Sequence, residues 1–160
     1  LKCKRNWTQF GARCFRMIPT SATWNASEQN CITIGAHLAS VHSGDEYAYL
    51  EALVLSVTKS NAITWIGGNN LVQGAVWVWT DGSEYNYTKW ASGEPDNFEN
   101  TEHCVQMNYG GGWNDMVCTV LSPSICAKPA IPARIKSVLR FKIISEKEML
   151  ASDIKNLLQQ

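Results

Sequence analysis

Residues 93–118 read GEPDNFENTEHCVQMNYGGGWNDMVC and combine carboxylates and side-chain amides with two cysteines, a proline and a tryptophan. Carboxylate and amide oxygens are the ligands that a hard cation such as calcium prefers, whereas zinc or copper would need histidine or cysteine. The one histidine of the segment, His103, directly follows Glu102, and alternation along a strand points it to the opposite face. From composition alone a solvated acidic loop is the first interpretation of the segment, since acidic side chains are mostly exposed, and an oxygen-lined cation site is the alternative.

The quoted segment belongs to a longer region of low periodicity that begins after Trp79 and is rich in Asp, Gly, Ser and Asn. A loop of this length inside a compact domain is usually functional or disordered. Because cysteines and tryptophans flank it as anchors, we interpret it as functional. Apolar runs broken by glycine and asparagine predict short strands at residues 63–68, 75–82, 103–115 and 122–127.

Two helices are predicted before this region. Residues 21–35 carry apolar side chains at helical spacing and end at a glycine, a common helix terminator. Residues 43–46 read SGDE, a capping-box pattern that opens a second helix. The apolar stripe of that helix consists of Tyr47, Leu50, Leu53, Val54 and Val57.

The composition is that of one domain with a core, since 45% of the 160 residues are hydrophobic. Large aromatic side chains are primarily core material, so we assign four tryptophans to packing: Trp7, Trp65, Trp77 and Trp79. The net charge is zero, but residues 1–127 carry 7 Lys or Arg against 11 Asp or Glu, and residues 128–160 carry 7 against 3. A neutral chain without a basic stripe does not support nucleic-acid binding.

Six cysteines without a CxxC pair favour three disulfides over a metal or thiol redox site, and they imply an oxidising compartment. Three Asn-x-Ser/Thr sequons, at Asn6, Asn25 and Asn86, agree with secretion and are candidate glycosylation sites. The chain does not begin with Met, shows no leader pattern and contains no apolar stretch of membrane-spanning length. We therefore expect a secreted, extracellular protein, as a mature product or an excised piece.

Two prolines shortly after residue 128 indicate a linker, which divides the chain into a domain at residues 1–128 and an extension at residues 129–160. Residues 134–144 alternate between apolar and polar side chains and predict a strand. A second capping box at residues 145–148 predicts a helix after it. The extension is thus predicted to be an appendage of one strand and one helix, and its role is unknown. One alternative to a plain appendage is homo-oligomerisation, because clustering increases the avidity of weak binding sites. Another is contact with a membrane surface.

Several motifs stand in an order and at a spacing that resembles the C-type lectin-like domain. They are Trp65-Ile66-Gly67-Gly68, Trp77-Val78-Trp79-Thr80-Asp81-Gly82, Glu94-Pro95-Asp96, Glu102-His103-Cys104, Trp113-Asn114-Asp115, and Cys118 followed by Cys126. The resemblance covers residues 3–128. It implies an α+β fold with two helices, two small antiparallel sheets and a long calcium-binding loop.

Six cysteines permit fifteen pairings that the sequence alone does not rank. The resemblance implies the pairs Cys31–Cys126, Cys104–Cys118 and Cys3–Cys14, the last belonging to the longer family form with an N-terminal hairpin. It also implies a sugar-binding calcium site at five residues: Glu94, Asp96, Glu102, Asn114 and Asp115, with a backbone carbonyl from Asp115.

Two further expectations concern this calcium site. The family holds the peptide bond before the corresponding proline in the cis form, which Pro95 permits. The auxiliary calcium positions of the family correspond here to neutral amides, Asn69, Gln73 and Asn97, so we expect one ion. Four carboxylates around that ion predict tight calcium binding with strong sensitivity to acid.

In the family, sugar hydroxyls bind the calcium and hydrogen-bond to its ligands, so the expected carbohydrate contacts are Glu94, Asp96, Phe98, Glu102 and Asn114. Glu-Pro-Asn goes with mannose-like sugars and Gln-Pro-Asp with galactose-like ones. This chain has Glu-Pro-Asp, and because an ionised carboxylate only accepts hydrogen bonds, the two classes are poorly distinguished. Asp96 slightly favours galactose-type ligands, as does Phe98 if its ring stacks on a sugar rather than anchoring the loop.

A glycosidase and a surface-binding module are the two alternatives to a lectin. A glycosidase would use Glu94 with Asp96 or Glu102 as acid and base, but carboxylates around a cation stay ionised, whereas the acid must stay protonated. We therefore do not expect an enzyme. A protein-binding or surface-binding module of the immune, venom or ice-binding types, which keeps the fold without binding sugar, is the main alternative.

Overall fold

The computed structural model describes residues 1–72 and 74–132, together with Ile143. The predicted strand and helix of the C-terminal extension lie outside the described residues. The helices are α1 (Trp24–Thr33), α2 (Gly44–Thr58) and the short 3-10 helix η1 (Phe98–Asn100). The strands are β1 (Thr8–Phe10), β2 (Arg13–Ala22), β3 (His37–Leu38), β4 (Thr64–Asn69), β5 (Val78–Trp79), β6 (Cys104–Tyr109), β7 (Gly112–Met116) and β8 (Ser122–Pro129).

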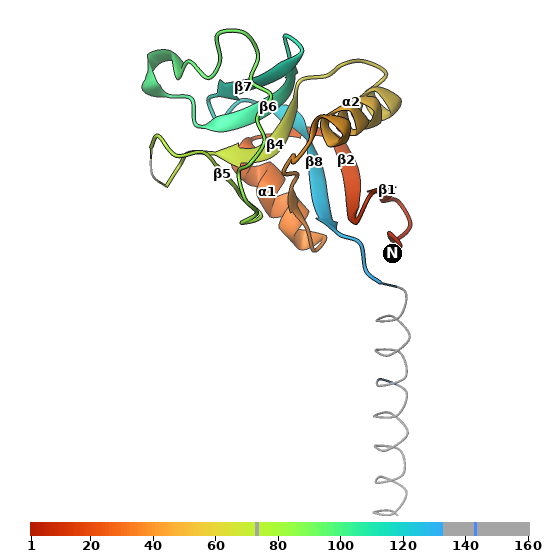
Figure 1. Cartoon of the computed structure of the whole chain (residues 1–160). Helices are drawn as coiled ribbons and strands as arrows, with labels where there is room; N and C mark the ends of the chain where they lie inside the picture. The colour runs from red at the N-terminus through yellow and green to blue at the C-terminus, as the bar shows by residue number, and fades with distance from the viewer. Residues whose placement is uncertain (73, 133–142, 144–160) are drawn as a thin grey trace, which may run out of the picture.

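The strands form one mixed sheet in the order β1-β2-β8-β4-β6-β7, with β3 paired to β8 and β5 paired to β4. Every pairing is antiparallel except that of β4 with β8, which is parallel at Trp65 and Ser124. The resemblance implied two antiparallel sheets. In the structure they are two groups of antiparallel strands, and the parallel pairing of β4 with β8 joins them into one sheet. β2 and β8 run toward the N-terminal end of the domain, whereas β6, β7 and η1 lie at the other end (Figure 1).

Both predicted helices are confirmed. Ser43 caps α2, because its side-chain oxygen accepts a hydrogen bond from the backbone N–H of Glu46 at 3.1 Å. The carboxylate of Glu46 bonds the backbone N–H of His42 at 3.0 Å instead of returning to Ser43, so the capping box is only half formed. The stripe prediction was wrong for Val57, which is 43% exposed because α2 extends beyond the part that packs on the sheet.

Two glycines let the strands pack closely around the buried core. A side chain at Gly67 would stand 2.7 Å from the carbonyl oxygen of Leu38, and one at Gly68 would stand 2.6 Å from Val105. Neither space admits a methyl group, so these positions of β4 require glycine. Trp65, the residue that begins this motif, is fully buried and donates its indole N–H to the carbonyl of Ala22 at 3.0 Å.

Three disulfides join the hairpin, helix and loop segments, and they pair as the resemblance implied: Cys3–Cys14, Cys31–Cys126 and Cys104–Cys118. The second ties α1 to β8, and the third ties the start of β6 to the segment after β7. Of the tryptophans assigned to packing, Trp65 and Trp79 are buried, while Trp7 and Trp77 are half-buried and pack against the core.

Candidate metal centre

The loop before β6 is anchored along β7. Ala91 donates its backbone N–H to the carbonyl of Trp113 at 2.9 Å, and Trp113 donates to the carbonyl of Lys89 at 2.7 Å. This close approach requires Gly112, because a side chain there would stand 2.4 Å from the Lys89 carbonyl oxygen. The loop therefore runs directly over the strand that carries the Trp113-Asn114-Asp115 motif.

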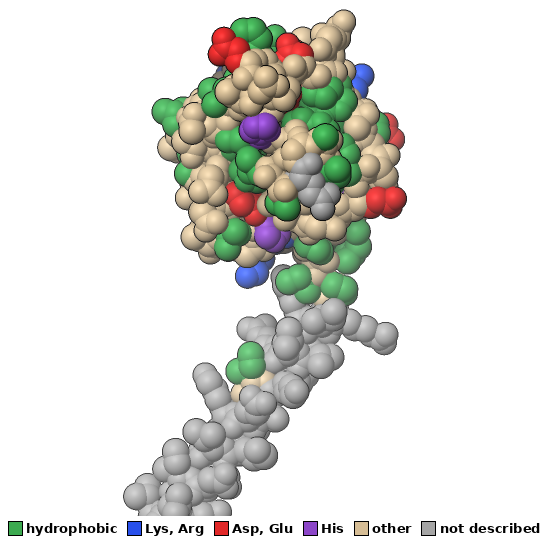
Figure 2. All heavy atoms as spheres, turned by 90° about the vertical axis from the view of Figure 1, so that its left-hand side faces the viewer, with side chains coloured by type: hydrophobic (Ala, Val, Ile, Leu, Met, Phe, Trp, Pro, Cys, Tyr) green, Lys and Arg blue, Asp and Glu red, His purple; other side chains and the backbone are tan. Residues whose placement is uncertain are grey.

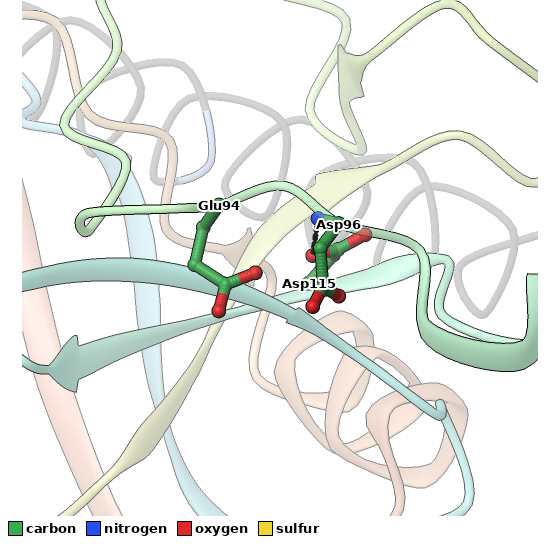
Figure 3. Close-up of side chains that lie close together, drawn as sticks. All are labelled: Glu94, Asp96 and Asp115. Atoms are coloured by element: carbon green, nitrogen blue, oxygen red, sulfur yellow. Dashed lines mark hydrogen bonds between the residues drawn. The ribbon is translucent and has the colours of Figure 1, made fainter.

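Asp115 of β7 connects the sheet to this loop through hydrogen bonds of its side chain. Its side chain is fully buried, and its two oxygens accept hydrogen bonds from the backbone N–H groups of Asp96 at 3.0 Å and Asn97 at 2.9 Å. The Glu94–Pro95 peptide bond is cis, which the presence of a proline permitted but the sequence did not determine. Glu94, Asp96 and Asp115 each offer one oxygen, and these three oxygens lie within 4.8 Å of one another (Figure 3).

Among the described residues, no positive side chain forms an ion pair with these three carboxylates. Burial raises the pKa of Glu94 above its ordinary value, and the neighbouring carboxylates of Asp96 and Asp115 raise it further. Burial also raises the pKa of Glu102; Asp115 and Asp96 add to the increase, which outweighs the hydrogen bond donated by the Phe98 N–H. The Oε2 atom of Glu94 is buried and has no hydrogen-bond partner among the described residues.

These observations test whether the residues fit a cation. A buried carboxylate oxygen without a partner is costly, and a divalent ion among the three carboxylates would satisfy it and remove their mutual repulsion. All the converging donors are oxygens, which suits calcium and does not suit zinc. The geometry and the donor set therefore fit a calcium ion.

Among the other predicted site residues, Glu102 lies close enough to Asp96 and Asp115 for their charges to raise its pKa, but it is not one of the three carboxylates that converge. Glu102 is buried, and its Oε2 accepts a hydrogen bond from the Phe98 N–H at 3.1 Å. Asn114 is 4% exposed, and its side chain makes no hydrogen bond within the described part of the chain. Its amide is therefore available to a ligand. Phe98 is 62% exposed, so it does not anchor the loop by burial.

Asn97 and His103 have hydrogen-bond partners within the domain. The side-chain oxygen of Asn97 accepts a hydrogen bond from the backbone N–H of Glu102 at 3.2 Å. Asn69 is buried in β4, and Gln73 lies outside the described residues. The ring of His103 faces the side-chain oxygen of Asn70 at 2.9 Å rather than the carboxylates. The number of ions thus stays a prediction.

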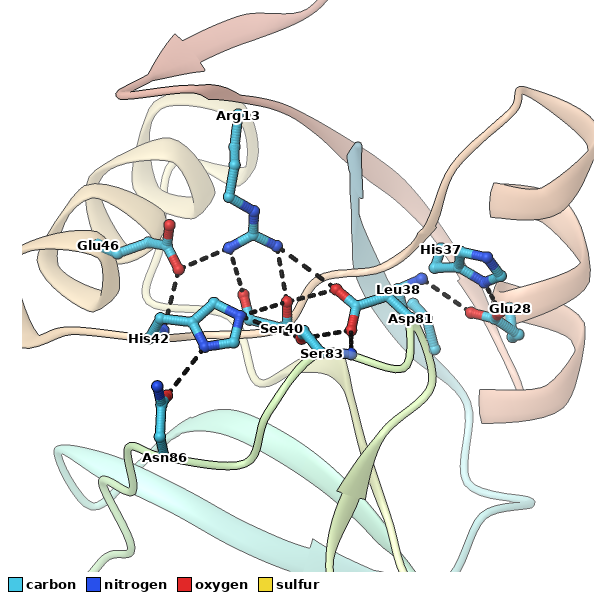
Figure 4. Close-up of polar contacts among 10 residues, drawn as sticks. All are labelled: Arg13, Glu28, His37, Leu38, Ser40, His42, Glu46, Asp81, Ser83 and Asn86. Carbon is cyan, nitrogen blue, oxygen red and sulfur yellow. Dashed lines mark hydrogen bonds and ion pairs between the residues drawn. The ribbon is translucent and has the colours of Figure 1, made fainter. Parts of the chain in front are cut away.

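A second polar cluster, which the sequence did not predict, surrounds Arg13 (Figure 4). Arg13 pairs with Glu46 at 2.7 Å and with Asp81 at 3.8 Å, and it donates to the hydroxyl of Ser40 at 2.7 Å. Burial alone would raise the pKa of Asp81, but hydrogen bonds from Ser40 and Ser83 and the charge of Arg13 lower it below its ordinary value. We call these residues the Arg13 cluster.

Comparison with known families agrees with the fold. A family model described as the lectin C-type domain matches residues 20–128. The chain therefore belongs to the C-type lectin domain family, a non-enzymatic carbohydrate-binding family, and the expectation that it is not an enzyme is confirmed.

Some of the similar proteins are named as lectins, and others are named as antifreeze proteins. Ladderlectin of Oncorhynchus mykiss is 42% identical over 125 residues, which cover 77% of this chain and 66% of ladderlectin. The galactose-specific lectin nattectin of Thalassophryne nattereri is 39% identical over 127 residues, covering 79% of this chain and 80% of nattectin. The structure of herring type II antifreeze protein superposes with a TM-score of 0.75 and 37% identity over 81% of this chain and 100% of that one.

Two of the sequence predictions bear on the compartment of the protein: the candidate glycosylation sites and the lack of a membrane-spanning stretch. Asn6, Asn25 and Asn86 are all exposed, and their glycosylation stays a prediction. None of the helices in the described residues has the length and apolar character needed to span a membrane.

Proposed function

We propose that this chain is an extracellular, calcium-dependent carbohydrate-binding lectin with a slight preference for galactose-type ligands. The observation that carries the proposal is the convergence of Glu94, Asp96 and Asp115, together with the buried Oε2 atom of Glu94, which has no hydrogen-bond partner among the described residues. Membership in the C-type lectin family and the similarity to a galactose-specific lectin support it.

Five residues would hold the ion: Glu94, Asp96, Glu102, Asn114 and Asp115. The bound calcium would supply a positive centre to which two neighbouring sugar hydroxyls coordinate. Glu94, Asp96 and Glu102 would accept hydrogen bonds from those hydroxyls, and Asn114 would be the donor. Asp115 has a positioning role as well, because it holds the backbone of Asp96 and Asn97 in place.

Phe98 supports the preference for galactose-type ligands. Its ring is exposed, and it follows Asp96 by two residues on the same loop. Its backbone N–H donates to Asp96 at 3.1 Å and to Glu102 at 3.1 Å, which fixes the residue beside the candidate metal ligands. An exposed ring held there is suited to stacking on the apolar face of a sugar.

Retention on immobilised galactose and immobilised mannose tests the proposal. We expect calcium-dependent retention on at least the galactose resin and release by a chelator. Absence of retention on both resins in calcium would exclude the lectin function.

Two single substitutions then test the specificity argument. Glu94→Gln restores a side-chain donor in the order Gln-Pro-Asp and should strengthen galactose over mannose. Asp96→Asn gives Glu-Pro-Asn and should reverse the preference. Each should change the ratio of the two affinities about tenfold, the usual size of one well-placed hydrogen bond to a polar ligand. If neither substitution changes the ratio, these two residues do not determine sugar choice.

The alternative of a surface-binding module is favoured by a different observation. Four hydrophobic side chains on the segment before and within β5 are exposed, Leu71, Val72, Val76 and Val78, with Val72 at 85%. Hydrophobic side chains are also spread over the middle of the face shown in Figure 2. Together with the similarity to herring type II antifreeze protein, this supports ice binding as the second candidate.

Thermal hysteresis of the purified chain, measured with calcium and with chelator, separates this candidate from the lectin. The lectin proposal predicts no thermal hysteresis. Hysteresis together with failure on both sugar resins would support the ice-binding function instead.

A further inference from the structure

The positive side chains of the domain are concentrated at the end opposite to the carboxylate loop. Residues 1–128 contain eight Lys or Arg, and six come from the N-terminal segment, β2 or the end of β8: Lys2, Lys4, Arg5, Arg13, Arg16 and Lys128. This end of the domain lies away from η1 and the loop before it (Figure 1). On the face shown in Figure 2, Lys and Arg are visible only at the margins.

The fold holds four of these side chains together. Cys14 of β2 and Lys128 of β8 are cross-strand partners, and Arg16 follows Cys14 by two residues, so all three project from one face of the sheet. The disulfide from Cys14 to Cys3 brings the two flanking lysines to the same place. We call this group the basic cluster; it consists of Lys2, Lys4, Arg16 and Lys128.

No carboxylate neutralises the basic cluster within the described residues. The ion pairs found there are Arg13 with Glu46, Arg13 with Asp81, and His37 with Glu28. Burial lowers the pKa of Lys128, and the positive charges of Lys4 and Arg16 lower it further. Like charges that are held together without a counter-charge form a surface that an anion would stabilise.

Lys128 is held in a fixed position at the centre of this cluster. Its Nζ atom lies 3.9 Å from the centroid of the Trp7 ring and donates to the carbonyl of Ile34 at 3.1 Å. An ammonium group has three donors, so at least one remains for a ligand after these contacts.

The surface around Lys128 is hollowed on both sides. A hollow of about 210 Å³ is lined by Lys2, Lys4 and Lys128, among others. A larger one of about 760 Å³ shares Lys128 with it, and its lining also includes Arg13 and the Arg13 partner Asp81. Three lysines therefore line the smaller hollow, whereas the charge of Arg13 in the larger one is already balanced by its carboxylate partners. A linear chain with repeated anionic groups fits this arrangement, whereas a flat membrane surface does not enter either hollow.

We propose that the basic cluster binds a polysulfated glycan independently of calcium, with one sulfate group in the smaller hollow and the chain extending along the same face toward Arg16. This site is separate from the candidate metal centre, so it would give the domain a second kind of carbohydrate contact. Sulfate is a tetrahedral acceptor of several hydrogen bonds, for which lysine and arginine side chains are the usual donors.

The test measures the affinity of a heparin-derived dodecasaccharide for the full chain in the presence of chelator, by isothermal titration calorimetry. The double variant Lys2→Gln, Lys4→Gln should weaken binding about tenfold, since it removes two charge-assisted contacts. Arg16→Gln, on a different strand, should weaken it about threefold. The matched control is Lys59→Gln, Lys89→Gln, which removes the same charge from the two remaining lysines of the domain and should change affinity less than about twofold.

Equal weakening by both double variants would show nonspecific attraction and overturn the proposal. So would loss of binding on chelation, or competition by galactose, because either result places the glycan at the metal centre. Binding to phosphatidylserine vesicles without binding to the soluble dodecasaccharide would replace the glycan by a membrane. Retention on the galactose resin, which we expect to be unchanged in all three variants, reports separately on the lectin function and on folding.

Discussion

The loop carboxylates and the Arg13 cluster present opposite electrostatic situations in one small domain. In the Arg13 cluster each carboxylate faces a cation or hydroxyl donors, and the pKa of Asp81 is lowered. In the loop, Glu94 and Glu102 face other carboxylates, and their pKa values are raised. The first cluster is complete with the chain's own residues, while the second lacks a positive charge. The difference indicates that the carboxylates of the Arg13 cluster stabilise the fold, whereas the loop carboxylates are arranged to bind a ligand.

Removing one glutamate from each region should give the largest contrast. In chelator, Glu46→Ala should lower the free energy of unfolding by about 2–3 kcal/mol, because it leaves the partly buried Arg13 without its 2.7 Å partner. Glu94→Ala should leave the calcium-free stability unchanged or slightly raised, since it relieves repulsion. Urea unfolding measures both variants, and equal losses would contradict the distinction between the two regions.

Calcium affinity should reverse the order of the same two variants. Glu94→Ala should weaken calcium binding by about 10-fold to 100-fold, because it removes a charged ligand from the candidate site. Glu46→Ala should not change it. Calorimetric titration of calcium into each variant gives the comparison, and unaltered affinity in Glu94→Ala would remove this residue from the metal centre.

Phe98→Ala sharpens the comparison within the loop itself. The ring is mostly exposed, so the free energy of unfolding should change by less than about 0.5 kcal/mol. Galactose affinity should fall about fivefold if the ring stacks on the sugar, and calcium affinity should stay the same. Loss of stability without loss of sugar affinity would make Phe98 a loop anchor instead.

The smallest effect concerns the pH dependence of stability without calcium. A carboxyl whose pKa is raised in the folded state contributes stability below its unfolded pKa and loses it as the pH rises through the folded value. Glu94 and Glu102 are of this kind, so their contribution disappears as the pH rises through the range above 4.5. Asp81 is the reverse case, and its contribution is lost as the pH falls below 3.8.

The unfolding free energies of Glu94→Gln and Asp81→Asn, compared with the parent between about pH 3 and about pH 7 in chelator, separate these contributions. The difference from the parent should grow with pH in opposite directions for the two variants. The same direction in both would show that the two regions are not electrostatically distinct.

Local patterns predicted the elements whose signals lie close together in the sequence. The cap at Ser43 and the stripe from Tyr47 to Val54 gave α2, and alternating apolar runs gave β4 and β6. The run at residues 75–82 was predicted less well, because only Val78 and Trp79 pair in a strand and the side chains of Ala75 and Val76 before them are exposed. Hydrophobic periodicity does not distinguish an exposed apolar segment from a buried one.

The sequence by itself determined the chemistry of the candidate site, since oxygen side chains at residues 94, 96, 102, 114 and 115 can be read directly from the motifs. Only the tertiary structure decided that Glu94, Asp96 and Asp115 meet, because that depends on the loop lying over β7. The Arg13 cluster and the basic cluster were likewise decided by strand register and disulfide geometry, which bring together residues far apart in the chain. Charge–charge interactions act through space, so a sequence shows which charges exist but not which of them become neighbours.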